Sequence, residues 1–161
     1  VKGSAPIITA GSTVSVAAED AAYNSANHSN TEGGYYLEYQ VFSDLTTGNR
    51  QVLSLDNGAD LLYYDSANNQ FESTDGTNTA SRAQALTAGT VYKVGLVYGD
   101  SKLRINVNGT WGTETSYDGA FPVGSDLDFL SAQAAPALIR NVRRYNADYD
   151  TATTTIEGLM S

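Results

Sequence analysis

The sequence predicts an all-β protein: a two-sheet antiparallel β-sandwich of the jelly-roll kind with a short C-terminal helix. First, Thr, Val, Tyr, Gly, Asn and Ser are abundant among its 161 residues. Second, turn-forming clusters of Gly, Asn, Asp and Ser separate short apolar segments, as in proteins made of strands. Third, several segments alternate between apolar and polar residues, which is the period of a half-buried strand. About ten short strands fit two stacked sheets better than a small barrel.

The first half of the chain contains the clearest strand, at residues 35–42. Successive side chains of a strand point to opposite faces, so its alternate apolar residues should share one buried face. These residues are Tyr35, Leu37, Tyr39 and Val41. Further strands are expected at residues 13–17, 51–55 and 61–64, around Phe71, and at residues 79–86.

The second half contains strong strands at residues 90–98 and 102–107, joined by a tight turn. Both alternate large apolar residues with small or polar ones, which indicates a pair with one face inward and the other wet. The last strand, residues 138–145, breaks strict alternation. A β-bulge near Arg140–Asn141 would bring Val142 to the core side. The residues expected in the core are Leu37, Tyr39, Tyr92, Val94, Leu96, Leu103, Ile105, Val107, Ile139 and Val142.

A short helix should end the chain. Thr154 followed by Glu157 fits a capping box, in which each side chain binds a free backbone N–H group of the first turn. The apolar side of this helix would contain Ile156, Leu159 and Met160. The predicted helix therefore begins at Thr154.

Length and composition bound the function. A chain of this length is one domain, residues 1–161, with residues 1–12 as a linker or N-terminal arm. The absence of cysteine and the single histidine argue against disulfides, thiolate-bound metals, a cysteine nucleophile and histidine-based sites. The formal net charge is −9, so neither nucleic acid nor an anionic membrane is expected as a partner.

Four segments stand in a characteristic order: YYLEYQVFS, QVLSLDNG, ALTAGTVYKVGLVYGDSKLRINVNGT and IRNVRRYNADYDTATTTIEGLM. This order resembles a concanavalin A-like, laminin G-like jelly-roll domain. In that family an apolar–Asn–Gly turn follows a strand opened by G-x-x-Y-K-V, and the closing strand has the form I-x-x-V-x-x-Y. The chain looks most like domains appended to bacteriophage virion proteins, in head decorations, tail fibres or tailspikes. The resemblance implies the sandwich fold and a virion or extracellular location.

The same family includes lectins, carbohydrate-binding modules, adhesion domains, glucanases and polysaccharide lyases, so the fold does not decide the function. Laminarinase-like members carry Glu-x-Asp-x-x-Glu on one strand. The closest string here runs from Glu72 to Asp75 and lacks the second Glu. Lyase-like members bring an Arg, a Gln and a His to the concave sheet, whereas His28 stands in a Ser-Asn loop. The protein is therefore expected not to be an enzyme.

Aromatic and Asx residues provide the candidate glycan contacts. Trp111, the only tryptophan, follows the tight turn at Asn108-Gly109, and a flat indole can stack on the apolar face of a sugar. The alternative is a packed side chain at the rim of the sandwich. The site is predicted where the turn at 56–60 and the loop at 111–117 meet. Its contact residues would be Trp111, Tyr117, Tyr64, Asp56 and Asn57.

Oxygen ligands at the same turn could hold calcium, the one cofactor that the sequence suggests. Asp56, Asn57 and Asp60 surround the turn, and clustered carboxylate and amide oxygens suit this ion. The alternative is that Asp and Asn stand there because they favour turns. Asp126 and Asp128 form a second candidate.

Three of the nine basic residues, Arg140, Arg143 and Arg144, lie close together in the last strand. They could form a patch for an acidic sugar or a partner subunit. The alternative is a solvated strand face beside acidic loops, where each ion pair contributes little.

These observations predict a non-catalytic carbohydrate-binding or adhesion domain of a phage virion or other extracellular protein. Its partner would be a glycan or cell-surface polysaccharide, bound in a groove at the rim of the sandwich. A second hypothesis is a structural decoration domain that packs on neighbouring virion proteins, which an exposed apolar patch would favour. The third hypothesis is a polysaccharide-cleaving enzyme.

Overall fold

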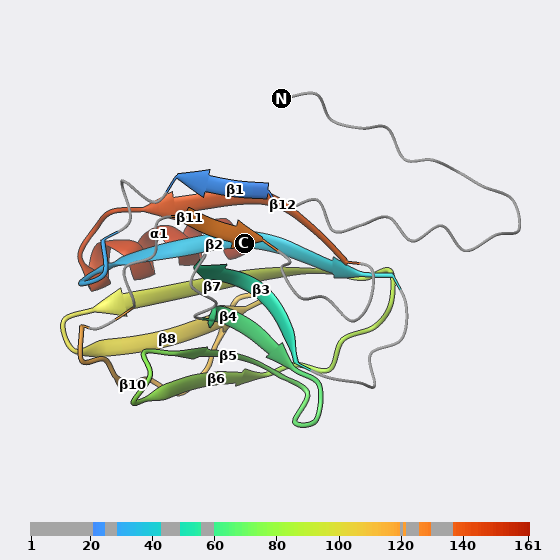
Figure 1. Cartoon of the computed structure of the whole chain (residues 1–161), viewed down its shortest axis with the longest axis horizontal. Helices are drawn as coiled ribbons and strands as arrows, with labels where there is room; N and C mark the ends of the chain where they lie inside the picture. The colour runs from blue at the N-terminus through green and yellow to red at the C-terminus, as the bar shows by residue number, and fades with distance from the viewer. Residues whose placement is uncertain are drawn as a thin grey trace, which may run out of the picture.

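The structure, a computed structural model, describes residues 21–24, 29–42, 49–55, 60–119, 121, 126–129 and 137–161. Two antiparallel sheets are stacked face to face, and one helix lies at the C-terminus, as Figure 1 shows. The predicted β-sandwich with a short C-terminal helix is therefore confirmed. Within the described ranges, no helix has the length and apolar character needed to span a membrane.

The first sheet has the strand order β1-β11-β3-β4-β5-β6, and all its neighbouring strands are antiparallel. Its strands are β1 (Ala21–Asn24), β3 (Arg50–Leu55), β4 (Asp60–Asp65), β5 (Gln70–Thr74), β6 (Thr79–Ala83) and β11 (Asp126–Phe129).

The second sheet has the order β10-β8-β7-β2-β12, with the short β9 paired to β8. Its strands are β2 (Gly33–Val41), β7 (Val91–Gly99), β8 (Lys102–Val107), β9 (Thr110–Trp111), β10 (Thr115–Ser116) and β12 (Ala137–Tyr145).

Most predicted strands occur close to their expected bounds. The strands expected at residues 51–55, 61–64, 90–98 and 102–107 correspond to β3, β4, β7 and β8. Strand β6 ends at Ala83, before the predicted residue 86, and β1 and β11 were not predicted. The strand expected at residues 13–17 and the arm at residues 1–12 lie outside the described residues.

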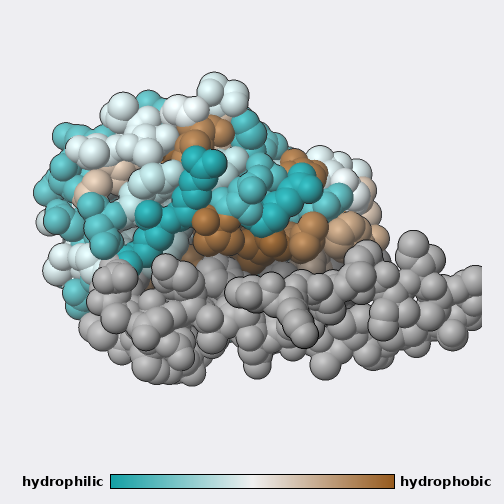
Figure 2. Space-filling view, turned by 90° about the horizontal axis from the view of Figure 1, so that it is seen from above, coloured by the Kyte–Doolittle hydropathy of each residue, from teal (hydrophilic) through white to brown (hydrophobic). Residues whose placement is uncertain are grey.

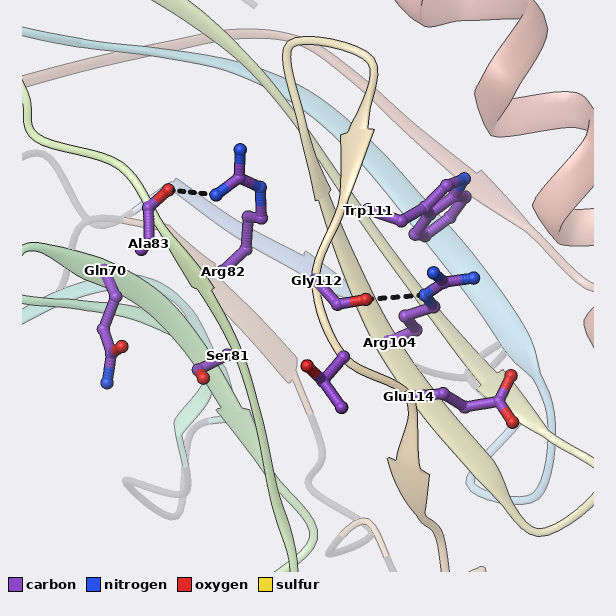
Figure 3. Close-up of a pocket in the computed structure, with 9 residues that line it drawn as sticks. Gln70, Ser81, Arg82, Ala83, Arg104, Trp111, Gly112 and Glu114 are labelled. Atoms are coloured by element: carbon purple, nitrogen blue, oxygen red, sulfur yellow. Dashed lines mark hydrogen bonds between the residues drawn. The ribbon is translucent and has the colours of Figure 1, made fainter.

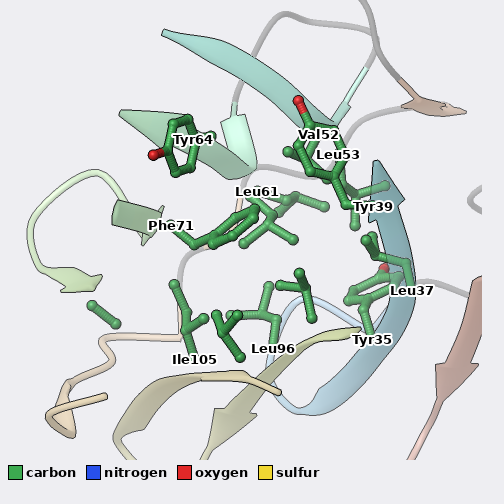
Figure 4. Packing of buried hydrophobic residues seen from close by; sticks show 14 of the residues in the cluster. Tyr35, Leu37, Tyr39, Val52, Leu53, Leu61, Tyr64, Phe71, Leu96 and Ile105 are labelled. Carbon is green, nitrogen blue, oxygen red and sulfur yellow. The ribbon is translucent and has the colours of Figure 1, made fainter. Parts of the chain in front are cut away.

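The core lies between the two sheets and is formed by large side chains from both, as Figure 4 shows. The aromatic rings meet edge to face: the Phe71 ring centre lies 5.8 Å from that of Tyr39 and 5.1 Å from that of Tyr64. Ile139 is half-buried and packs against this cluster. The predicted core residues that are buried are Leu37, Tyr39, Tyr92, Val94, Leu96, Leu103, Ile105 and Val107.

Strand β12 contains the predicted bulge, but the bulge does not act as expected. Its pairing with β2 shifts between Arg140 and Arg143, and Asn141 has a left-handed φ of 53°. Val142 is nevertheless 39% exposed, so its predicted place in the core is wrong. After the bulge it is Arg144 that stands opposite a buried tyrosine of β2, on the inner face.

The outer face of the second sheet is covered by α1 (Tyr149–Met160), so the prediction of a wet face is wrong for this part. Two strand glycines allow the close approach: a Cβ on Gly95 would lie 2.5 Å from Ile156 Cγ2, and one on Gly34 would lie 3.1 Å from Ile156 Cδ1. The buried cluster under the helix contains Tyr36, Val97, Tyr149, Ala152, Ile156 and Met160.

The helix begins earlier than predicted. Asp148 is the N-cap residue, and its side chain accepts hydrogen bonds from Thr151 N and Thr151 Oγ1, both at 2.9 Å. The capping box at Thr154 and Glu157 is therefore wrong, because both residues lie inside the helix. An aspartate at the N-cap satisfies the same free N–H groups.

Candidate functional site

An open groove lies where β6 of the first sheet approaches the segment that connects β8, β9 and β10 of the second (Figure 3). Its volume is about 610 Å³. Its lining is mostly polar, and the Trp111 ring is its one large apolar side chain. The lining residues are Gln70, Ser81, Arg82, Ala83, Arg104, Trp111, Gly112, Thr113 and Glu114.

Gly112 allows the two sheets to meet so closely at this rim. A Cβ at this position would lie 2.1 Å from the carbonyl oxygen of Ser81, so a larger residue does not fit. Gly112 N donates to Ile105 O at 2.8 Å. The preceding turn has φ values of 49° at Asn108 and 82° at Gly109, the left-handed conformation that Asn and Gly tolerate in two-residue hairpin turns.

The sequence left open whether Trp111 is an exposed platform for a sugar or a packed side chain at the rim. Its side chain is half-buried, which lies between these two alternatives. Its Nε1 donates a hydrogen bond to Glu157 Oε1 of α1 at 2.8 Å. The guanidinium carbon of Arg104 lies 5.2 Å from the centre of the indole ring. The indole is thus held in place from two sides and keeps part of its surface in the groove.

The two groove arginines are oriented by backbone carbonyl groups. Arg104 Nε donates to Gly112 O at 2.8 Å, and Arg82 Nε donates to Thr110 O at 3.2 Å. Arg82 Nη1 also donates to Ala83 O. Figure 3 shows the two side chains reaching the segment around Gly112 from opposite sides.

Glu114 joins the groove to the first turn of α1. Its Oε2 accepts a hydrogen bond from the Tyr149 hydroxyl at 2.8 Å. Burial, together with the bond to Glu114, raises the pKa of Tyr149. Because its pKa is raised, the tyrosine stays a neutral donor at physiological pH. Lys102 Nζ lies 5.1 Å from the centre of the Tyr149 ring.

Two of the predicted contact residues, Tyr64 and Tyr117, lie inside the protein. The Tyr64 side chain is fully buried, and its hydroxyl donates to Gln84 O at 3.1 Å. Tyr117 packs against Tyr98 and Phe121, and burial raises its pKa to about 12. Neither ring presents a face to solvent, so the prediction of both as sugar platforms is wrong.

The predicted calcium turn is only partly described. Asp56 and Asn57 lie outside the described residues, and for Asp60 the structure describes the backbone in β4 but not the side chain. The same holds for Asp126 and Asp128 in β11. In the described part of the chain, no group of three or more potential metal-ligating side chains gathers. The calcium site and the contacts at Asp56 and Asn57 remain predictions.

The three arginines of β12 do not form one patch. Arg140 Nε forms an ion pair with Glu38 Oε2 at 2.7 Å, and Arg143 is exposed nearby on the strand. The guanidinium carbon of Arg144 lies 5.9 Å from the ring centre of Tyr35, on the inner side.

The sequence identified Trp111 but missed the residues that surround it. Gln70, Ser81 and Arg82 come from β5 and β6, whereas Arg104 comes from β8 in the other sheet. No local pattern indicates which strands meet at the rim. The signal that was available is Gly112, a glycine directly after a strand, which often marks a close backbone approach.

The described fold resembles solved β-sandwich proteins. Trypanosoma rangeli sialidase matches with a TM-score of 0.61 and 16% identity, over 81% of this chain and 22% of the sialidase. The same enzyme in complex with sialic acid matches with a TM-score of 0.54 and 20% identity, over 81% and 23%. A single-residue mutant of HCR/D matches with a TM-score of 0.62 and 11% identity, over 88% of this chain and 41% of HCR/D.

This chain therefore spans about a fifth of the sialidase and about two fifths of HCR/D. A scan against protein-family models and a search of curated proteins found no match. At these identities the likeness shows the fold alone, which is a two-sheet antiparallel β-sandwich.

Proposed function

We propose that this domain binds carbohydrate, without cleaving it, in the groove between β6 and the β8–β9 hairpin. One observation carries the proposal: the half-exposed Trp111 indole lines one open groove together with amide, hydroxyl and guanidinium groups. A sugar offers an apolar ring face and several hydroxyl groups, and it needs this combination of partners. The indole is already anchored by Glu157, so little ordering is required on binding.

The similar structures support a sugar as the ligand. One of them is a sialidase, which was also solved in complex with sialic acid. A domain that binds glycans in this way would be part of an extracellular or virion protein, as the sequence resemblance implies. We include that location in the proposal.

The groove favours binding over hydrolysis. Among its lining residues, the only carboxylate is Glu114, and that group already accepts a hydrogen bond from Tyr149. Most glycoside hydrolases need two carboxyl groups about 5–9 Å apart across the scissile bond. We therefore propose that the groove holds the sugar without reacting with it.

Calorimetric titration of wild-type protein and of Trp111→Ala, with glycans selected on an array, tests the proposal. We expect Trp111→Ala to lose about tenfold or more in affinity, because a stacked aromatic residue contributes on the order of 1–2 kcal/mol. Phe42→Ala is the matched control, since Phe42 is 52% exposed and does not line the groove. Equal affinities for all three proteins, or no glycan bound by the wild type, would contradict the proposal.

A second candidate function is packing against a neighbouring protein of a particle. Among the described residues, the large apolar side chains that are most exposed are Phe42 at 52%, and Leu138 and Val142 at 39% each. Figure 2 shows hydrophobic side chains gathered in a limited stripe with hydrophilic side chains along one edge. Sedimentation of the wild type and of a Phe42→Ser, Leu138→Ser double variant tests this candidate. Association that the double variant loses, with glycan affinity unchanged, would favour packing.

A further inference from the structure

We propose that the groove prefers sugars that carry carboxylate groups over neutral sugars, an inference that rests on the proposed function. The charge of the lining is opposite to that of the chain. The lining contains two bases, Arg82 and Arg104, and one acid, Glu114, so its formal charge is +1. The whole chain carries −9. A positive groove in an acidic protein is suited to an anionic ligand group.

Both arginines keep donors that the protein does not use. Arg104 donates through Nε to Gly112 O, and Arg82 donates through Nε and Nη1 to backbone carbonyl groups. Within the described residues, both Nη atoms of Arg104 and Nη2 of Arg82 make no hydrogen bond, and neither guanidinium has a carboxylate at ion-pair distance. The backbone bonds fix the planes of the guanidinium groups, so the remaining donors are preorganised.

The acidic residues around the groove are already engaged as acceptors. Glu114 accepts from Tyr149, and Glu157 accepts from Trp111. Glu72, beside Gln70, accepts from the Gln70 amide. The neighbouring carboxylates thus have donors other than the arginines. A carboxylate of the ligand is the group that would complete the hydrogen bonding of the guanidinium donors.

The geometry points to a polymer with repeated acidic groups. Arg82 and Arg104 approach the segment around Gly112 from opposite sides, so they are available to separate carboxylates (Figure 3). Trp111 lies against Arg104 and offers the surface on which an intervening sugar ring can stack. Acidic polysaccharides present such repeated carboxylates: hyaluronan has one on every second ring, and alginate and polygalacturonate have one on every ring.

The decisive comparison uses wild-type protein and matched ligands. Oligomers of hyaluronan, alginate and polygalacturonate are each titrated beside their carboxyl-reduced forms, in which a neutral hydroxymethyl group replaces each carboxylate. We expect at least one acidic oligomer to bind about tenfold or more tightly than its reduced form, because charge-assisted hydrogen bonds are roughly twice as strong as neutral ones. The folded state of the protein is the same on both sides of this comparison.

Variants then locate the effect. Arg104→Gln and Arg82→Gln should each reduce the affinity for the acidic form more than the affinity for the reduced form, so that the preference for the acidic form falls about threefold to tenfold. Arg143→Gln is the matched control, because it removes the same charge from an exposed arginine outside the groove. Glu114→Gln should strengthen binding of the acidic form, because it removes the negative charge of the lining.

The outcomes separate the two proposals. Reduced oligomers that bind as tightly as the acidic ones would overturn the carboxylate preference and leave the glycan-binding proposal standing. A preference that Arg143→Gln lowers as much as the groove variants would also overturn it. If no oligomer of either form binds, the carboxylate preference is overturned, and the array-selected glycans with the Trp111→Ala titration decide the glycan-binding proposal.

Discussion

The two faces of the second sheet are buried by different means. The inner face is filled by large side chains such as Leu37, Leu96 and Ile105, all with no exposed surface. The outer face is buried where glycine, at Gly34 and Gly95, leaves room for α1. The inner face is therefore held by side-chain volume alone, whereas the outer face also depends on the close approach of a helix to two glycines. The groove borders the part of the outer face that α1 covers, and the Trp111–Glu157 hydrogen bond joins the two.

The largest expected effect comes from the inner face. Leu96→Ala and Ile105→Ala should each lower the free energy of unfolding by about 2–5 kcal/mol, because each leaves a cavity among close-packed side chains. Both residues pair with each other across β7 and β8. Urea denaturation measures the change. Losses below about 1 kcal/mol at both positions would show that volume does not hold this face.

Alkaline pH should also act through the inner face. Burial raises the pKa of Tyr35 and Tyr39 to about 12, so both are neutral in the fold at a pH where the unfolded chain ionises. Their contribution to stability is complete below pH about 10 and is lost as the pH rises toward 12. Unfolding followed by tyrosinate absorbance should start in this window, and Tyr39→Phe should move it to higher pH. Tyrosines that all ionise freely near pH 10 would contradict this account.

The outer face should respond to added volume instead of lost volume. Gly95→Ala should destabilise the protein by about 1–3 kcal/mol, because its Cβ would overlap Ile156 and Met160 of α1. Gly158→Ala is the control on the helix itself: nothing lies within 4 Å of its Cβ, so it should stabilise by about 0.5–1 kcal/mol. Thermal unfolding distinguishes the opposite signs. If Gly95→Ala left the stability unchanged, α1 would not pack closely against Gly34 and Gly95.

The smallest effect is expected at the start of the helix, in acid. Hydrogen bonds from the Thr151 backbone and side chain lower the pKa of Asp148. This cap contributes above the ordinary Asp pKa of about 4 and is lost as the pH falls through the lowered value. Hydrogen exchange of α1 amides should then accelerate relative to β7 between about pH 4 and pH 2. Asp148→Asn should remove the extra acceleration, since its amide oxygen still caps the helix.

The same comparison explains what the sequence could predict. Strict alternation in β2, β7 and β8 identifies the inner face, because burial there follows the period of a strand. The outer face follows another rule. There, Gly95 inside an apolar strand marks the place where α1 approaches the strand closely, and it does not mark a weak point of the strand. Val142 shows what residue spacing alone cannot predict. After the bulge at Asn141, it is Arg144 and not Val142 that lies on the inner face.

The candidate site was predictable only in part. Trp111 was identifiable as the only tryptophan next to a tight turn. Tyr64 and Tyr117 were misplaced, because a tyrosine can lie in the core when its hydroxyl reaches a backbone carbonyl group, as Tyr64 does at Gln84. Arg82 and Arg104 become neighbours of one groove through the meeting of two sheets, and local sequence does not encode which strands meet.

Fluorescence of Trp111 tests the central claim most directly, because it is the only tryptophan and reports on the groove alone. The measurement is acrylamide quenching of the wild type with and without saturating acidic oligosaccharide, at concentrations where calorimetry shows binding. We expect a saturable change in emission with the same dissociation constant as calorimetry, and weaker quenching because the sugar covers the exposed part of the indole. Binding that leaves both the emission and the quenching of Trp111 unchanged would place the glycan elsewhere and contradict the account.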